Sequence, residues 1–262
     1  MTASSNGSGV GCADVDASCV ESSVGINAVR RCVPSEQLCL SGGGRRRTVT
    51  VTDGDDEGED AVRAWTAPGT APLVGEITLL LADDIHRTWS ALDEEAPPFW
   101  AFAWVGGQAL ARHVLDHPDL VRGRRVLDLA SGSGIVAIAA ALAGAEDVIA
   151  SDTDARSRTA ITLNAAANGV EVAVVGDVLG GEHDLDVDVV LAGDVFYEQP
   201  MARHMERFCD EASAAGVDVV VGDPGREYLP RRRCTALAGY DVTDTADLEG
   251  GATTRTTVYR FT

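Results

Sequence analysis

The residues with the clearest chemical meaning lie between Val126 and Ala145, in the sequence VLDLASGSGIVAIAAALAGA. An apolar run ends in Asp128, a loop of small residues follows, and an apolar segment of helical character completes the unit. Glycines at such a strand-to-helix turn let a small molecule approach the backbone closely. The stretch therefore predicts a ligand site, and GSGIVA at 132–137 matches the dinucleotide fingerprint G-x-G-x-x-G/A.

Three aspartates that follow predicted strands narrow the choice of ligand. Asp128 precedes the loop, where a carboxylate would repel a pyrophosphate and suits a positively charged ligand. Asp152 ends the next strand, where an acid can accept both ribose hydroxyls, and Asp177 follows the third, where an acid can take an adenine amino group. S-adenosylmethionine is an adenosine ligand with an α-amino acid and a positive centre. The amides near Gly132 and Gly134 are expected to hold its amino-acid portion.

Each of these features also has an alternative interpretation. Asp128 could cap a helix or a turn, and Asp177 could form an Asx turn at a strand end. A NAD-dependent oxidoreductase remains the alternative raised by the glycine loop, because Asp152 fits the ribose of NAD equally well. The Tyr-x-x-x-Lys pair of one large group of such enzymes is impossible here, since the chain contains no lysine.

The elements that position these residues alternate between strands and helices. Strands are predicted at 125–129, 147–151, 171–175, 187–192 and 217–221, and helices at 134–143, 154–167 and 199–214. Near-continuous Val, Ile and Leu runs indicate parallel strands covered on both faces. The residues from Gly239 onward predict a closing antiparallel hairpin. The pattern predicts a doubly wound α/β sheet with its ligand at the carboxyl ends of the strands.

Two further helices are predicted ahead of this core. An amphipathic helix within PLVGEITLLLADDIHRTWSAL, which begins at Pro72, is predicted from apolar residues at helical spacing: Ile77, Leu80, Leu81, Ile85 and Trp89. A Pro-bounded aromatic segment, APPFWAFAWVGG, follows. GGQALARHVLDHP then predicts a second helix.

Residues 1–62 differ in composition from the rest of the chain. They are rich in Ser, Gly, Thr and Asp and end in the acidic run DGDDEGED at 53–60, so they predict a disordered acidic extension ahead of a domain at 63–262. Four cysteines of this extension lack the close pair typical of zinc sites, and the histidines are scattered, so no metal site is predicted: Cys12, Cys19, Cys32 and Cys39.

The net charge of −20 argues against a general nucleic-acid binder, because phosphate contacts need a cationic face. The N-terminus does not resemble a signal peptide, and no apolar run approaches the roughly 20 residues that span a bilayer. A cytoplasmic protein without a membrane segment is therefore expected. An acidic, lysine-free composition favours adaptation to high salt, and the alternative is a GC-rich genome that favours Arg, Ala, Gly and Asp codons.

Four segments together resemble a known family more specifically than the glycine loop does. They are PPFWAFAWVGGQALARHVLDHP, VLDLASGSGIVAIAA, VLAGDVFYEQP and VVGDPGREYLP. Their order is similar to that of class I methyltransferases, and they most resemble the electron-transfer-flavoprotein β-subunit lysine methyltransferases and their prokaryotic relatives. The resemblance covers about residues 63–262. Some relatives are labelled nicotinamide N-methylases or resemble ribosomal protein L11 methyltransferases, so a small-molecule amine is the alternative acceptor.

This resemblance implies a Rossmann-like seven-stranded sheet, mostly parallel with a C-terminal antiparallel hairpin. It also implies S-adenosylmethionine as cofactor and a protein acceptor lysine, with the electron transfer flavoprotein β subunit as one such acceptor. A D-x-x-Y-like motif is matched by Asp194, expected to attract and orient the acceptor ammonium, and Tyr197, expected to form an aromatic wall. The implied cofactor-binding residues are Trp104, Asp128, Ala130, Ser131, Gly132, Gly134, Asp152, Thr153, Asp177 and Gly193.

Two residues depart from the family pattern. Ala130 replaces the first glycine of the general G-x-G-x-G loop and is expected to be tolerated if its φ stays negative. Val105 stands where related families often have proline, and this change is expected to loosen the turn ahead of the helix. Asp223 and Arg226, in the loop GDPGREYLP, could shape the acceptor mouth or merely close the loop.

Overall fold

The computed structural model describes residues 37–39, 48–50, 56–92, 96–179, 186–243 and 253–262. The helices are α1 (Asp56–Trp65), α2 (Ile85–Leu92), α3 (Val105–Asp116), α4 (Ile135–Leu142), α5 (Ala155–Ala167) and α6 (Gln199–Ala214). The strands are β1 (Gln37–Cys39), β2 (Thr48–Thr50), β3 (Ala67–Ala71), β4 (Val74–Leu81), β5 (Arg125–Leu129), β6 (Asp147–Ser151), β7 (Ala173–Val175), β8 (Val189–Gly193), β9 (Asp218–Asp223), β10 (Cys234–Thr243) and β11 (Thr253–Phe261).

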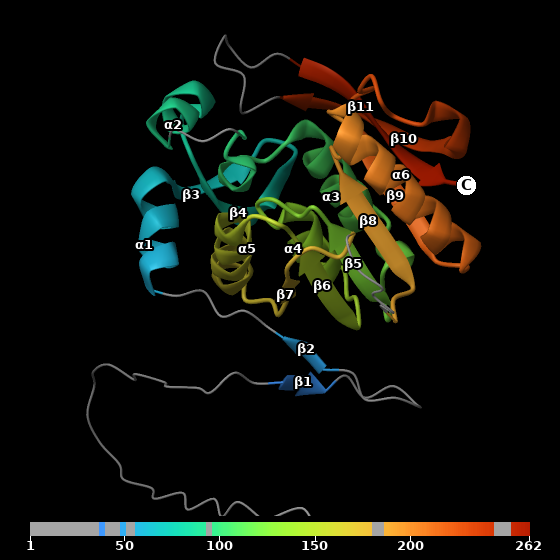
Figure 1. Cartoon of the computed structure of the whole chain (residues 1–262), viewed down its shortest axis with the longest axis horizontal. Coiled ribbons are helices and arrows are strands. Elements are labelled where there is room, and N and C mark those ends of the chain that lie inside the picture. The colour runs from blue at the N-terminus through green and yellow to red at the C-terminus, as the bar shows by residue number, and fades with distance from the viewer. Residues whose placement is uncertain (1–36, 40–47, 51–55, 93–95, 180–185, 244–252) are drawn as a thin grey trace, which may run out of the picture. The chain divides into compact units, whose positions relative to one another are not determined.

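A seven-stranded sheet in the order β10-β11-β9-β8-β5-β6-β7 forms the centre of the domain. The five strands from β9 to β7 run parallel, and β11 pairs antiparallel with both β9 and β10. Figure 1 shows this final hairpin, in orange and red, beside β9. The chain leaves β5 toward β6 on one side and later returns to β8 on the other. This switch point is where an open α/β sheet binds its ligand, and the predicted sheet is confirmed.

The hydrophobic core lies on both faces of this sheet, because successive side chains of each strand point to opposite faces. On β8, Val189 and Leu191 pack with α3 and α4, whereas Val190 and Ala192 pack with α6 on the opposite face. All four side chains are at most 1% exposed. The near-continuous apolar runs therefore reflect two buried faces, as the sequence predicted.

The amphipathic helix predicted from Ile77 to Trp89 is wrong over its first half. Val74–Leu81 forms strand β4, which pairs antiparallel with β3, and only Ile85–Leu92 is helical. Ile77 and Leu79 pack into one hydrophobic cluster and Leu80 into another. A strand that buries side chains on both faces produces apolar spacings that coincide with those of a helix, so periodicity alone did not distinguish the two.

Helix α1 crosses the boundary predicted between residues 62 and 63. Its Val62 is fully buried in a cluster that includes Leu80 of β4 and Ala160 of α5. The packed domain therefore already includes α1. Cys12, Cys19 and Cys32 lie outside the described residues, as does most of the predicted extension, and β1 and β2 form a separate two-stranded antiparallel ladder.

Four glycines bring the start of α3 against the ends of β8 and β9. A Cβ atom on Gly106 would lie 2.4 Å from the carbonyl oxygen of Gly222, and one on Gly193 would lie 2.8 Å from the Cα of Gly107. Only glycine permits such close backbone contact. The first turn of α3 is thereby fixed at the carboxyl end of β8, where Asp194 follows.

No helix within the described part of the chain is both long enough and apolar enough to span a bilayer.

Candidate active site

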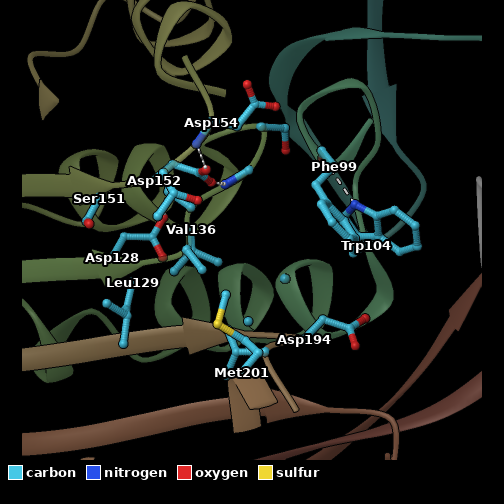
Figure 2. A pocket seen from close by; sticks show the side chains of 18 of the residues that line it. Phe99, Trp104, Asp128, Leu129, Val136, Ser151, Asp152, Asp154, Asp194 and Met201 are labelled. Carbon is cyan, nitrogen blue, oxygen red and sulfur yellow. Dashed lines mark hydrogen bonds between the residues drawn. The ribbon is translucent and has the colours of Figure 1, made fainter. Parts of the chain in front are cut away.

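A pocket of about 420 Å³ lies at the carboxyl ends of β5, β6 and β8. Its lining contains every residue predicted for the site except Gly134: Trp104, Asp128, Ala130, Ser131, Gly132, Asp152, Thr153, Asp177, Gly193, Asp194 and Tyr197. Figure 2 shows Asp128 and Asp152 on one side of this pocket, and Trp104 and Asp194 on the other. The tertiary structure therefore gathers residues from segments that are far apart in the sequence.

Asp152 holds the glycine loop in place. Its Oδ2 accepts a hydrogen bond from the amide of Gly132 at 2.8 Å, and its Oδ1 accepts one from the amide of Asp154 at 3.0 Å (Figure 2). Burial raises the pKa of this carboxyl above its ordinary value. Each carboxylate oxygen has two acceptor positions, so Asp152 keeps capacity for ligand hydroxyls.

The two loop amides expected to hold the ligand are already occupied. The amide of Gly132 donates to Asp152, and the amide of Gly134 donates to the carbonyl oxygen of Ser131 at 2.9 Å. These two amides are thus engaged within the protein, and the role of the amides near them toward the ligand stays a prediction. Gly134 is instead a conformational residue: its φ is 84°, it precedes α4, and a Cβ atom there would press on Ile161 at 3.3 Å.

Asp128 organises the loop from inside the protein. Its Oδ2 accepts hydrogen bonds from the hydroxyl of Ser131 at 2.5 Å and from the amide of Ala137 in α4 at 3.0 Å. The residue is 1% exposed, and burial raises its pKa to about 7. The structural interpretation of Asp128 as a turn and helix acid therefore holds, and it also lines the pocket.

Ala130 adopts a left-handed backbone conformation, with a φ of 54°. The expectation that its φ would stay negative is wrong. The loop geometry requires a positive φ at this position, and alanine accepts it at a cost that glycine would avoid.

Asp177 lies in a turn after β7 and also lines the pocket. Its Oδ1 accepts a hydrogen bond from the amide of Leu179 at 2.7 Å, which is the Asx-turn pattern. This geometry is compatible with both interpretations of Asp177, as a residue of an Asx turn and as an acceptor for an adenine amino group. Leu179 lines the same part of the pocket and provides an apolar surface beside the acid.

Three aromatic side chains line the pocket beside Asp194. The ring centroid of Phe99 lies 5.5 Å from that of Trp104 and 5.2 Å from that of Tyr197, and Trp104 Nε1 donates to the carbonyl oxygen of Phe99 at 3.1 Å (Figure 2). Burial raises the pKa of Tyr197 to about 12, so its phenol is neutral at neutral pH. Phe99 thus joins the other two rings in the pocket wall.

Asp194 is strained, buried and ion-paired. Its φ is 62°, and its amide donates to the carbonyl oxygen of Gly222 at 2.8 Å. Oδ1 accepts a hydrogen bond from Nε of Arg226 at 2.7 Å, and Oδ2 accepts one from the amide of Gly106 at 3.2 Å. The carboxylate was expected to attract the acceptor ammonium, but its charge is already paired with a guanidinium.

Sequence reasoning missed several pocket residues: Asp154, Met201, Met205, Leu179 and Val136. Met201 and Met205 lie one turn apart on α6, and Met205 is fully buried. Their spacing is that of an ordinary core-facing helix, so nothing in the sequence separates a pocket wall from a core contact. Asp154 caps α5 by accepting from the amide of Arg156 at 2.9 Å, a role that its position before the helix could have predicted.

The polar groups that line the pocket fit S-adenosylmethionine better than they fit a dinucleotide. A pyrophosphate site needs free backbone amides, yet the loop amides of Gly132 and Gly134 are already engaged. The pocket presents carboxyl groups from Asp128, Asp152 and Asp177 instead, which suit an ammonium, hydroxyls and an amino group. Within the described residues, no three His, Cys, Asp or Glu side chains gather to hold a metal ion.

The sheet order and this acid-lined pocket together define a nucleoside-binding domain of the methyltransferase type. The family model of ribosomal protein L11 methyltransferase (PrmA) matches residues 109–201. Among solved structures, a ribosomal protein L11 methylase from Lactobacillus delbrueckii subsp. bulgaricus superimposes with a TM-score of 0.42 and 20% identity, over 58% of this chain and 76% of that one.

Sequence relatives identify the family more narrowly. The chain is 33% identical to the electron transfer flavoprotein beta subunit lysine methyltransferase of Danio rerio, over 93% of this chain and 95% of that protein. It is 34% identical to the enzyme of the same name from Homo sapiens, over 72% of this chain and 76% of that protein. The chain therefore belongs to the electron transfer flavoprotein beta subunit lysine methyltransferase family, and it is an S-adenosylmethionine-dependent methyltransferase.

Proposed function

We propose that this enzyme methylates the side-chain amine of lysine in a protein acceptor, and that the acceptor is the β subunit of an electron transfer flavoprotein. The observation that carries the proposal is the position of Asp194 and Tyr197, which line the same pocket as Asp152 and the glycine loop. The names of the relatives support the choice of acceptor.

The carboxyl groups would hold S-adenosylmethionine by its polar ends. Asp152 would accept hydrogen bonds from the ribose hydroxyls, Asp177 would accept one from the adenine amino group, and Asp128 would face the ammonium. Leu179 and Met201 line the pocket and provide apolar contacts. When bound, S-adenosylmethionine supplies a methyl group activated by a positively charged sulfur.

The aromatic rings would form the channel for the acceptor side chain. The ring of Phe99 contacts the rings of both Tyr197 and Trp104, so apolar ring surfaces would line the approach. The methylene stem of lysine packs favourably against such rings, and a cationic end gains a cation–π interaction before it loses its proton. These contacts orient the nitrogen, and orientation is the main contribution that a reaction with an activated methyl group asks of the protein.

Tyr197 does not act as a general base. Its pKa is about 12, because burial disfavours the phenolate, and its hydroxyl makes no hydrogen bond to another described residue. We therefore expect the ring to matter more than the hydroxyl. Tyr197→Phe should keep most of kcat/KM. In Tyr197→Ala, kcat/KM should fall roughly a hundredfold, because the acceptor lysine would no longer be positioned by the ring.

The direct test uses purified enzyme, methyl-labelled S-adenosylmethionine and purified electron transfer flavoprotein β subunit. Label is expected on the protein band, with mass spectrometry placing it on lysine, and Tyr197→Ala should remove it while Tyr197→Phe does not. The enzyme contains no lysine, so methylation of its own lysines cannot contribute. Label found only in a low-mass fraction with cell extract would instead support a small-molecule N-methyltransferase.

A further inference from the structure

The ion pair between Asp194 and Arg226 lies at the side of the pocket where the acceptor nitrogen is expected. The side chain of Asp194 is 5% exposed and that of Arg226 is 36% exposed. Asp194 lines the pocket, whereas Arg226 is not among its lining residues. Arg226 therefore pairs with the charge of Asp194 without itself being a lining residue of the pocket.

A second acid fixes the loop that carries Arg226. Asp223, at the end of β9, is fully buried, and its Oδ1 accepts hydrogen bonds from the amides of Gly225 at 2.6 Å and Arg226 at 2.7 Å. The backbone of Arg226 is thus held where its side chain meets Asp194. Because two hydrogen bonds to Asp223 hold this turn, the ion pair between Arg226 and Asp194 is a fixed part of the site.

We propose that Arg226 occupies the charge of Asp194 so that the acceptor site favours the neutral amine of lysine over its ammonium form. This inference rests on the proposed function. Lysine has a pKa of about 10.4 in water and must lose a proton before its nitrogen can attack a carbon. A buried carboxylate without a partner would hold the ammonium and raise that pKa, which opposes the reaction.

A guanidinium is suited to this task because it stays charged at every pH where the enzyme works. The other charged or titratable groups around Asp194 and Tyr197 reinforce the need for it: Asp223 at the end of β9, Glu198 before α6, the neutral phenol of Tyr197 and, across the pocket, Asp152 after β6. Without Arg226 the carboxylate of Asp194 would lack the guanidinium that pairs with it. With Arg226 in place, the acceptor ammonium gains little on entering and gives its proton to solvent.

The first test measures binding of n-butylammonium, the cationic end of a lysine side chain, to enzyme saturated with S-adenosylhomocysteine at pH 7. Arg226→Gln removes the charge but keeps a hydrogen-bond donor for Asp194. It should bind n-butylammonium about tenfold more tightly than the unaltered enzyme, because the carboxylate charge becomes available. Arg226→Lys keeps the positive charge and should behave like the unaltered enzyme.

Arg231→Gln is the matched control, because Arg231 directly follows the same loop and its guanidinium donates to the carbonyl oxygen of Gly225, at 2.9 Å, and not to Asp194. It should leave n-butylammonium binding unchanged. Equal binding by Arg226→Gln and the unaltered enzyme, including no binding by either, would overturn the proposal. So would tight binding by Arg226→Lys. Thermal unfolding of each variant shows whether it is folded. If Arg226→Gln does not fold, n-butylammonium binding by Arg226→Lys is the remaining test, and tight binding by that variant would overturn the proposal.

The second test follows methyl transfer to electron transfer flavoprotein β subunit as a function of pH. Arg226→Gln should move the rising limb of kcat to higher pH by about one unit, because kcat reports the pKa of the bound lysine, and this shift is the counterpart of tenfold tighter ammonium binding. An unshifted profile with uniformly lower activity would indicate a merely structural residue. If the unaltered enzyme does not methylate this subunit at all, the proposed acceptor is wrong, and n-butylammonium binding alone decides the role of Arg226.

Discussion

The amide of Gly132 donates a 2.8 Å hydrogen bond to Asp152, so the acid at the end of β6 fixes the loop at the end of β5. Asp152→Ala should therefore both free the loop and remove the partner of the ribose hydroxyls. We expect the affinity for S-adenosylhomocysteine, measured by calorimetry, to fall roughly a hundredfold, as for two lost charge-assisted hydrogen bonds. Asp147→Asn, at the opposite end of the same strand, should leave affinity intact, and equal loss in both variants would contradict this role.

The left-handed conformation of Ala130 predicts an unusual effect of glycine. Ala130→Gly should raise the free energy of unfolding, by up to about 1 kcal/mol, because glycine adopts a φ of 54° without strain. Ala137→Gly, the same substitution inside α4, should lower it by about 1 kcal/mol. Denaturant unfolding of both variants provides the comparison, and a destabilised Ala130→Gly would show that the loop is not strained.

Asn164 connects the β3–β4 hairpin to the glycine loop. Its Oδ1 accepts from the amide of Leu80 at 2.8 Å, and its Nδ2 donates to the carbonyl oxygen of Ser133 at 2.8 Å. Asn164→Asp keeps the first bond and breaks the second, so it should weaken S-adenosylhomocysteine binding about tenfold and lower stability by about 1–3 kcal/mol.

Asn168, which caps the C-terminal end of α5 one turn later, provides the matched control for that experiment. It binds the same strand through Thr78, with Oδ1 accepting at 2.9 Å and Nδ2 donating at 2.7 Å, but has no bond to the glycine loop. Asn168→Asp should lose similar stability while retaining ligand affinity. If both variants lose affinity equally, the hairpin as a whole, rather than Asn164, supports the loop.

The buried carboxyl of Asp128 predicts a pH dependence of stability. Its pKa in the folded protein is about 7, above the ordinary value of 3.8, so the protonated form is the one that folding favours. Its contribution to stability is complete below about pH 4 and is lost as the pH rises through 7, on the order of 4 kcal/mol in all. Asp128→Asn should remove this slope, and denaturant unfolding at several pH values would reveal whether it persists.

The net charge of −20 predicts a stabilising effect of salt. Charges repel one another across the surface at low ionic strength, and molar salt shortens the screening length to about 3 Å. We expect the thermal unfolding midpoint to rise between low and molar KCl. A midpoint that does not rise would leave codon usage as the explanation for the acidic, lysine-free composition.

Periodicity and residue type predicted much of the fold, but they did not predict β4. The parallel strands were recognisable because their runs of Val, Ile and Leu are buried on both faces. Strand β4 instead depends on pairing with β3 and on amide contacts from Asn164 and Asn168, which are more than eighty residues away along the chain. No local pattern contains that information.

The sequence by itself predicted a ligand that contains adenosine and placed its site. Acids placed after successive parallel strands must meet at one edge of the sheet, so Asp128, Asp152 and Asp177 could be assigned to one pocket from their positions alone. Only the tertiary structure decided which groups are free to bind. Hydrogen bonds and ion pairs between distant segments occupy the amide of Gly132 and the carboxylate of Asp194, and such pairing depends on distances that the order of residues does not contain.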